Sequence, residues 1–197
     1  MHAVLLCDFT SLNAAVTTTF TDFDFETSDY AVTVLNGSPK ADGYTLSNVG
    51  GELRVRMPLE FSGSALFIGN TSFVADPGVL GALESIDVAF NAGVLNGNAA
   101  VAAMLMQGGD FFYGGTVITR SDDFDVSYSF TSLDGLEFSA GSEPIGIGIL
   151  TSANGATFDV NFRIDEFTAT VTSVPEPSAL LSCCVLGAMV FMRRRKK

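Results

Sequence analysis

Between Thr17 and Val171 the chain is a succession of short segments in which apolar and polar residues alternate, separated by Gly, Asn, Asp and Pro. Alternation with a period of two is typical of half-buried β-strands, and the separating residues are typical of turns. No segment in this range has the apolar periodicity of an amphipathic helix. We therefore expect one all-β domain over residues 17–173, folded as a two-sheet antiparallel sandwich of the jelly-roll type.

Two segments within this domain allow specific predictions. Residues 99–106 are rich in Ala, Leu and Met, which favour helices, but they are few and have Asn-Gly-Asn and Gly-Gly on either side, so we expect a strand buried on both faces. In the last strand the apolar positions change phase after Ile164 and resume at Phe167. This shift predicts a β-bulge at Asp165 and Glu166.

The start of the domain has a similar alternation. Phe23 and Phe25 are interleaved with Asp22, Asp24 and Glu26, which predicts a strand with aromatic side chains on one face and carboxylates on the other. Farther along, the glycine pair after Val49 predicts a tight turn into a strand that ends before a proline.

The charge of the chain is distributed unevenly. The formal net charge is −12, and 21 of the 22 acidic residues but only five of the ten basic residues precede Pro175. An acidic body repels polyphosphate chains, because binding them requires basic groups that displace counterions. We expect no binding to nucleic acid.

The sequence gives little support to an enzyme. His2 is the single histidine, and the chain has no nucleophile elbow, phosphate-binding glycine loop or zinc-ligand spacing. A carboxylate pair at Glu84 and Asp87 makes a glycoside hydrolase a distant alternative, although residues three apart on a strand face opposite sides. We therefore expect a domain without catalytic activity.

Calcium is the one cofactor that the sequence suggests. Acidic residues gather at both ends of the domain and at one strand entry, and hard oxygen ligands suit this ion. If the first and last strands are neighbours, Asp24 and Asp165 are the expected ligands. The other interpretation is an acidic face that serves solubility.

An aromatic segment with Gly-Gly on each side is a candidate ligand site. Phe112 and Tyr113 lie in the sequence Phe-Phe-Tyr, and exposed aromatic rings can stack on the apolar faces of sugars. The alternative is that at least two of the three rings belong to the core. The first interpretation predicts a carbohydrate-binding module whose partner is an extracellular polysaccharide.

The last two dozen residues have a composition of their own. Val174-Pro-Glu-Pro-Ser178 leads into an uncharged apolar run over residues 179–192, and five consecutive basic residues end the chain. The prolines stop the preceding strand, and the run with its basic end predicts a membrane helix whose C-terminus stays in the cytoplasm.

These residues resemble the PEP-CTERM sorting signal, a C-terminal segment of exported bacterial surface proteins. The resemblance covers 174–197 and is carried by Pro175, Glu176, Pro177 and Ser178, by the apolar helix, and by Arg193, Arg194 and Arg195. It implies processing by an exosortase-type membrane enzyme. It also implies export through an inner-membrane intermediate to the cell surface or extracellular matrix.

The N-terminus agrees only in part with export. Residues 1–16 contain a short apolar run without a preceding basic residue, so we expect a signal peptide whose front part is missing from the sequence.

The domain itself also resembles concanavalin-like and laminin-G-like jelly rolls in three short segments, 23–26, 50–55 and 162–167. The whole sequence thus predicts an exported surface or matrix protein with an adhesive or structural domain. A calcium-dependent carbohydrate-binding module is the alternative function.

Overall fold

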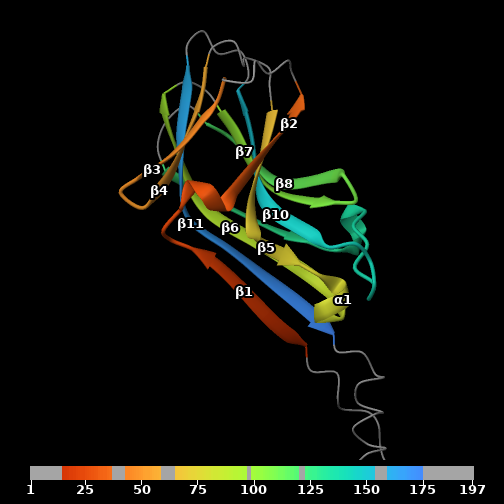
Figure 1. Cartoon of the computed structure of the whole chain (residues 1–197). Helices are drawn as coiled ribbons and strands as arrows, with labels where there is room; N and C mark the ends of the chain where they lie inside the picture. Colours follow the sequence, from red (N-terminus) through yellow and green to blue (C-terminus); the bar gives the residue numbers. More distant parts are fainter. Residues whose placement is uncertain are drawn as a thin grey trace, which may run out of the picture.

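The computed structural model describes residues 15–36, 43–58, 65–96, 99–119, 123–153 and 159–174. In this part of the chain two antiparallel β-sheets pack face to face, which confirms the expected all-β sandwich (Figure 1). The sorting-signal residues 175–178 and 193–195 and the expected membrane helix lie outside the described residues, as does nearly all of the expected leader. Among the described residues, no helix has the length and apolar character needed to cross a membrane.

The first sheet, sheet A, has six strands in the order β3-β4-β11-β6-β9, with β1 also paired to β11. Its strands are β1 (Val16–Asp22), β3 (Thr45–Val49), β4 (Glu52–Met57), β6 (Ala82–Asn96), β9 (Asp123–Phe130) and β11 (Val160–Val174). Figure 1 shows the two long strands, β6 and β11, running side by side through this sheet.

The second sheet, sheet B, has five strands in the order β2-β5-β10-β7-β8. Its strands are β2 (Tyr30–Asn36), β5 (Ala65–Ala75), β7 (Ala99–Gln107), β8 (Asp110–Thr119) and β10 (Ile145–Ala153). In the described ranges, short helical turns also join strands, namely η1 (Thr27–Asp29), α1 (Pro77–Leu80) and η3 (Ser132–Asp134). The expected strand over 99–106 is therefore confirmed as β7, and most of its side chains are buried.

The core lies between the sheets and is built from one side of each alternating strand. On β11, for example, Phe162, Ile164, Phe167 and Ala169 are fully or almost fully buried, while the residues between them are partly or fully exposed. The ring of Phe167 stacks on Phe73 of sheet B at a centroid distance of 5.0 Å. Burial of these apolar side chains is the main favourable contribution to folding.

The predicted β-bulge is confirmed in the middle of β11. The register with β6 shifts between Asp165 and Thr168, and Glu166 has a left-handed backbone with φ of 53°. The same edge of β11 pairs with β4 before the bulge, up to Ile164, and with β1 after it, from Phe167. The bulge thus lets one long strand hold two short strands in succession.

The prediction of a strand across residues 22–26 is wrong, because β1 ends at Asp22. The Oδ1 atom of Asp22 accepts hydrogen bonds from the backbone N–H groups of Asp24 and Phe25, at 3.1 and 2.8 Å. A short acidic side chain that bonds its own downstream backbone turns the chain in place of a strand ladder. Phe25 adopts a φ of 46° and is fully buried, whereas Phe23 points outward and is 59% exposed.

The two described ends of the domain lie next to each other. Val16 pairs with Ser173, one residue before the end of β11, so the chain enters and leaves the sandwich at the same end (Figure 1).

Candidate functional site

The outer face of sheet A carries three shallow hollows that follow one another along β6. The first is lined by Phe23, Ala89, Phe90, Asn91, Asp125, Val126, Ser127, Glu166 and Thr168. The second is lined by Gly93, Val94, Leu95, Asp123 and Arg163. The third, of about 470 Å³, is lined by Thr45, Ser47, Val49, Arg54, Val55, Arg56, Leu95, Asn96, Asn161 and Phe162. We call the three together the sheet A groove.

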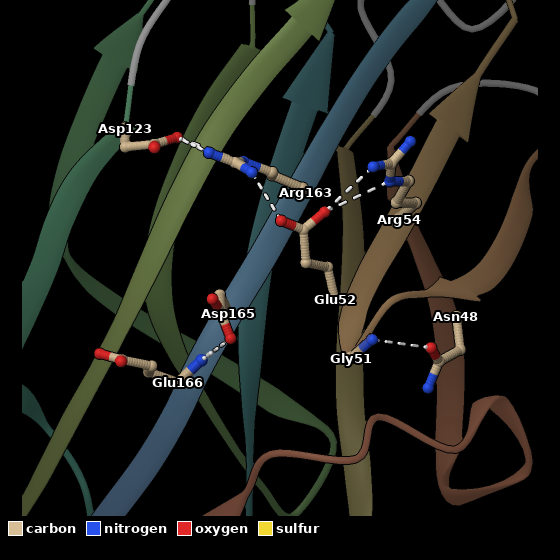
Figure 2. A network of polar contacts seen from close by, with 8 residues as sticks. All are labelled: Asn48, Gly51, Glu52, Arg54, Asp123, Arg163, Asp165 and Glu166. Atoms are coloured by element: carbon tan, nitrogen blue, oxygen red, sulfur yellow. Dashed lines mark hydrogen bonds and ion pairs between the residues drawn. The ribbon is translucent and has the colours of Figure 1, made fainter.

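Arg163 occupies the centre of this groove. Its Nη1 atom donates to Oε1 of Glu52, and its Nε and Nη2 atoms donate to Oδ1 of Asp123, with an Nε distance of 3.2 Å. Figure 2 shows the guanidinium reaching from β11 between these two carboxylates. The hydrogen bond to Asp123 is the main cause that raises the pKa of Arg163 above its ordinary value. The guanidinium is therefore a fixed positive group at the centre of the groove.

Glu52 also joins Arg163 to a second arginine. Arg54 lies directly opposite Arg163 in the pairing of β4 with β11, where two like charges would repel each other. The Oε2 atom of Glu52 accepts from Nε and Nη2 of Arg54, at 3.4 and 3.2 Å (Figure 2). One carboxylate thereby compensates the repulsion between both guanidinium groups.

Gly93 is what allows Arg163 to reach Asp123. These three residues lie in one row across the sheet, because Gly93 pairs with Arg163 on one side and with Asp123 on the other. A Cβ atom on Gly93 would lie 2.5 Å from Oδ1 of Asp123 and 2.9 Å from Nε of Arg163. The absence of a side chain leaves room for the ion pair to cross β6.

The next row of the sheet is mostly acidic. Asp165 pairs with Asn91, which pairs with Asp125, and the Asn91 amide donates to the Asp125 carboxylate at 3.1 Å. The backbone N–H of Glu166 donates to Oδ1 of Asp165 at 2.8 Å, which places both carboxylates at the bulge (Figure 2). This end of the groove offers amide and carboxylate groups to a ligand.

Phe23 stands beside this acidic row and is held from two sides. Asp22 fixes the backbone after it, as described above, and the side-chain amide of Asn48 donates to the carbonyl oxygens of Asp24 and Phe25. Asn48 in turn accepts from the backbone N–H of Gly51 at 3.3 Å (Figure 2). An exposed ring on a fixed backbone loses little conformational entropy when a ligand stacks on it.

Asp22 also connects the Phe23 loop to buried residues in the interior. Its Oδ2 atom accepts from the Tyr30 hydroxyl at 2.8 Å and from the Asn70 amide at 3.0 Å, and both of these residues are buried. Burial, followed by the hydrogen bond to Asp22, raises the pKa of Tyr30 far above its ordinary value. Asp22 therefore links the Phe23 loop on sheet A to β2 and β5 of sheet B.

The third hollow, at the other end of the groove, has further polar groups. Arg56 donates from Nε to Oδ2 of Asp159 at 3.0 Å, and the Asn96 amide donates to the Asp159 carbonyl at 3.1 Å. The two bonds join β4 and β6, the strands on either side of β11, to the segment that enters β11.

The two residues expected to bind calcium come from segments that the fold brings together. The condition for that prediction is confirmed, because β1 and β11 are paired neighbours. Within the ranges that the structure describes, no group of three or more His, Cys, Asp or Glu side chains is arranged to hold a metal ion. Calcium binding at Asp24 and Asp165 stays a prediction.

Phe112 and Tyr113, the expected ligand-binding pair, lie on opposite faces of β8. Phe112 packs against the core, whereas Tyr113 is 62% exposed on the outer face of sheet B. The neighbouring Phe111 meets Phe67 edge to face, with ring centroids 5.6 Å apart. Adjacent residues of a strand cannot share a face, so this pair does not form one platform.

Glu84 and Asp87, the pair considered for glycoside hydrolysis, are both exposed on β6. Asp87 accepts from the Ser85 hydroxyl at 3.4 Å. Neither residue lines one of the three hollows described above.

Comparisons with known proteins give structural likenesses only. No family model matches the chain, and no curated protein matches it. Among solved structures, a variant of a family 29 carbohydrate-binding module has 14% identity and a TM-score of 0.46, and the match covers 79% of this chain and 92% of that one. The C-terminal family 22 module of Clostridium thermocellum Xyn10B has 12% identity and a TM-score of 0.49, with 77% and 91% covered. A CBM4 structure has 16% identity and a TM-score of 0.46, with 75% and 97% covered.

Proposed function

We propose that the described sandwich is a non-catalytic domain that binds a polysaccharide chain along the sheet A groove. The observation that carries this proposal is Phe23, an exposed ring at the first hollow beside the polar side chains of Asn91, Asp125 and Glu166. Binding sites for small ligands combine an aromatic surface with a few fixed polar groups, and the apolar face of a sugar ring suits the first while its hydroxyls suit the second.

The dimensions of the groove favour a chain over a single sugar. The three hollows extend along β6 from Ala89 to Asn96. At about 3.4 Å per residue this segment is about 24 Å long, which gives space for several sugar units in a row.

Binding without hydrolysis agrees with the placement of the carboxylates. Asp123 in the groove and Glu52 beside it are engaged by arginines, and Glu84 and Asp87 stand outside the groove. We therefore assign to Glu52 and Asp123 the role of positioning the arginines, and to Asp125 and Glu166, which line the first hollow, the role of hydrogen-bond acceptors.

Replacing Phe23 tests the proposal. The purified chain and its Phe23→Ala variant are titrated with soluble β-glucan, galactomannan and β-1,4-galactan, and affinities are measured by calorimetry. Loss of one stacking ring, together with the apolar area that it buries, is expected to weaken binding by about tenfold or more. Because Phe23 is exposed, the unfolding temperature should change little.

Two control variants accompany this experiment. Leu133→Ala removes a side chain that is 95% exposed on η3, outside the groove, and should bind like the wild type. Tyr113→Ala removes the exposed ring of sheet B. If Tyr113→Ala abolishes binding while Phe23→Ala does not, the site is on sheet B and the proposal is wrong.

We also propose that the chain is exported and sorted through residues 174–197, as the PEP-CTERM resemblance implies. The arrangement of the described domain supports this. β11 ends at Val174, whereas the groove uses residues 161–168 of the same strand, so a tether that starts after Val174 would leave the groove accessible. Cell fractionation and the mass of the surface form, for the wild type and a variant with Pro175 and Pro177 replaced by Ala, test this proposal; unchanged processing of the variant would contradict it.

A further inference from the structure

We propose that the sheet A groove selects uncharged polysaccharides over those that carry uronate groups, and that Glu52 and Asp123 are the residues that determine this selectivity. The inference rests on the proposed function, since it concerns the ligand of the same groove.

The arginines of the groove are already neutralised. Arg54 is paired with Glu52, Arg56 with Asp159, and Arg163 with both Glu52 and Asp123. These three are all the basic side chains in the part of the chain that the structure describes. A uronate carboxylate would therefore meet guanidinium groups whose positive charge is already offset by a carboxylate of the fold.

Further carboxylates make the groove unfavourable for acidic sugars. Asp125, Asp165 and Glu166 lie at the Phe23 end. Asp125 accepts from the Asn91 amide and Asp165 from the backbone N–H of Glu166, and the described residues give none of the three an ion pair. A chain that stacks on Phe23 would bring its own charged groups close to these three. Repulsion between these carboxylates and a charged ligand weakens binding, and the repulsion is greatest at low salt.

An uncharged chain meets no such cost. Neutral hydroxyl groups can donate to the carboxylates and accept from N–H bonds of the guanidinium groups that point away from the ion pairs. Arg163 has five N–H bonds and uses three of them toward Glu52 and Asp123. The ion-paired side chains thus present hydrogen-bond donors and acceptors to the hydroxyl groups of an uncharged chain.

The experiment uses matched polymers and the full-length chain. Soluble β-glucan, galactomannan and β-1,4-galactan are each compared with the same polymer after oxidation of its primary alcohols at C6 to carboxylates. The wild type is expected to bind at least one neutral polymer, and to bind its oxidised form at least about tenfold more weakly at low salt. High salt should reduce that difference because it screens the repulsion.

The double variant Glu52→Gln/Asp123→Asn is expected to remove most of the preference. Both amides keep the size and an acceptor oxygen of the original side chains while the negative charges are removed, so Arg163 becomes available to a uronate. Binding of the oxidised polymer should increase by about tenfold or more, and the gain should disappear at high salt. The unfolding temperature identifies a variant that has lost its fold, and in that case the wild-type comparison alone decides.

The outcomes separate the two proposals. If the wild type binds none of the polymers, neutral or oxidised, the proposed function fails. If it binds oxidised polymers as tightly as neutral ones or more tightly, the selectivity is overturned while polysaccharide binding stands. A folded double variant without any gain for the oxidised polymer also overturns the role of Glu52 and Asp123.

Discussion

The substitution Gly93→Ala gives a sharp test of how the groove is built. Gly93 has no positive φ, so its backbone accepts alanine, but the new methyl group would lie 2.5 Å from Oδ1 of Asp123 and 2.9 Å from Nε of Arg163. A Cβ atom does not approach other atoms this closely, and both contacted atoms belong to side chains, which can rotate away, and not to the backbone. The ion pair across β6 must therefore open, and the guanidinium must leave its place at the centre of the groove.

The expected change in stability is small because two effects oppose each other. Alanine in a strand is favoured over glycine by about 0.5–1 kcal/mol. Loss of the pair costs about 0.2–1 kcal/mol, the range for exposed ion pairs, since the side chain of Asp123 is 52% exposed. The free energy of unfolding should therefore stay within about 1 kcal/mol of the wild type.

The expected change in binding is large. Hydrogen bonds from a charged donor contribute about 1.5–3 kcal/mol, so displacement of the Arg163 guanidinium should weaken polysaccharide binding by about tenfold or more. Urea unfolding and calorimetric titration measure the two quantities on the same samples. Gly146→Ala is the matched control, because the atom nearest to its methyl group would be in the Met106 side chain on sheet B, at 3.6 Å, which is an ordinary van der Waals contact.

Two results would refute this reasoning. Wild-type affinity in the Gly93→Ala variant would mean that the guanidinium has no part in binding. A loss of stability well above 1 kcal/mol, with Gly146→Ala unaffected, would mean that the strand backbone rather than the ion pair yields to the methyl group.

Two further predictions concern the support beneath Phe23. Asp22→Ala leaves the Tyr30 hydroxyl and the Asn70 amide without their buried acceptor, so urea unfolding should show a loss of about 2–4 kcal/mol, and polysaccharide binding should weaken because the Phe23 loop is released. The second prediction concerns alkaline pH. The raised pKa of Tyr30 means that the folded domain keeps this hydroxyl protonated where the unfolded chain loses the proton, so the stability contribution is complete below about pH 10 and declines above it by up to about 1.4 kcal/mol per pH unit. Tyr30→Phe should reduce the slope of stability against pH above pH 10 by one proton, and an unchanged slope would contradict the assignment.

The sandwich could be predicted from the sequence because its signals are local. Alternation marks the buried face of each strand, and the phase shift at Asp165 and Glu166 locates the bulge in β11. The error at residues 22–26 has a local cause as well. Asp22 turns the chain by bonding to the next backbone N–H groups, and a pattern of alternating Phe and Asp does not distinguish this turn from a strand.

The groove could not be predicted because it depends on which strands are neighbours. Arg163, Gly93 and Asp123 are far apart in the sequence and meet only because β11, β6 and β9 are adjacent in one register. A glycine in a strand does signal close approach of other groups, so Gly93 was a usable clue. The identity of those groups required the sheet order.

The most direct test of polysaccharide binding along sheet A is a map of the bound face. Amide chemical shifts of the isotopically labelled protein can be followed by NMR while a neutral polysaccharide that it binds is added. We expect the largest shifts at Asn91, Gly93 and Arg163 and little change at Gly69 and Gly148 of sheet B. Shifts confined to Gly69, Gly148 and Tyr113, with the sheet A residues unchanged, would contradict the account.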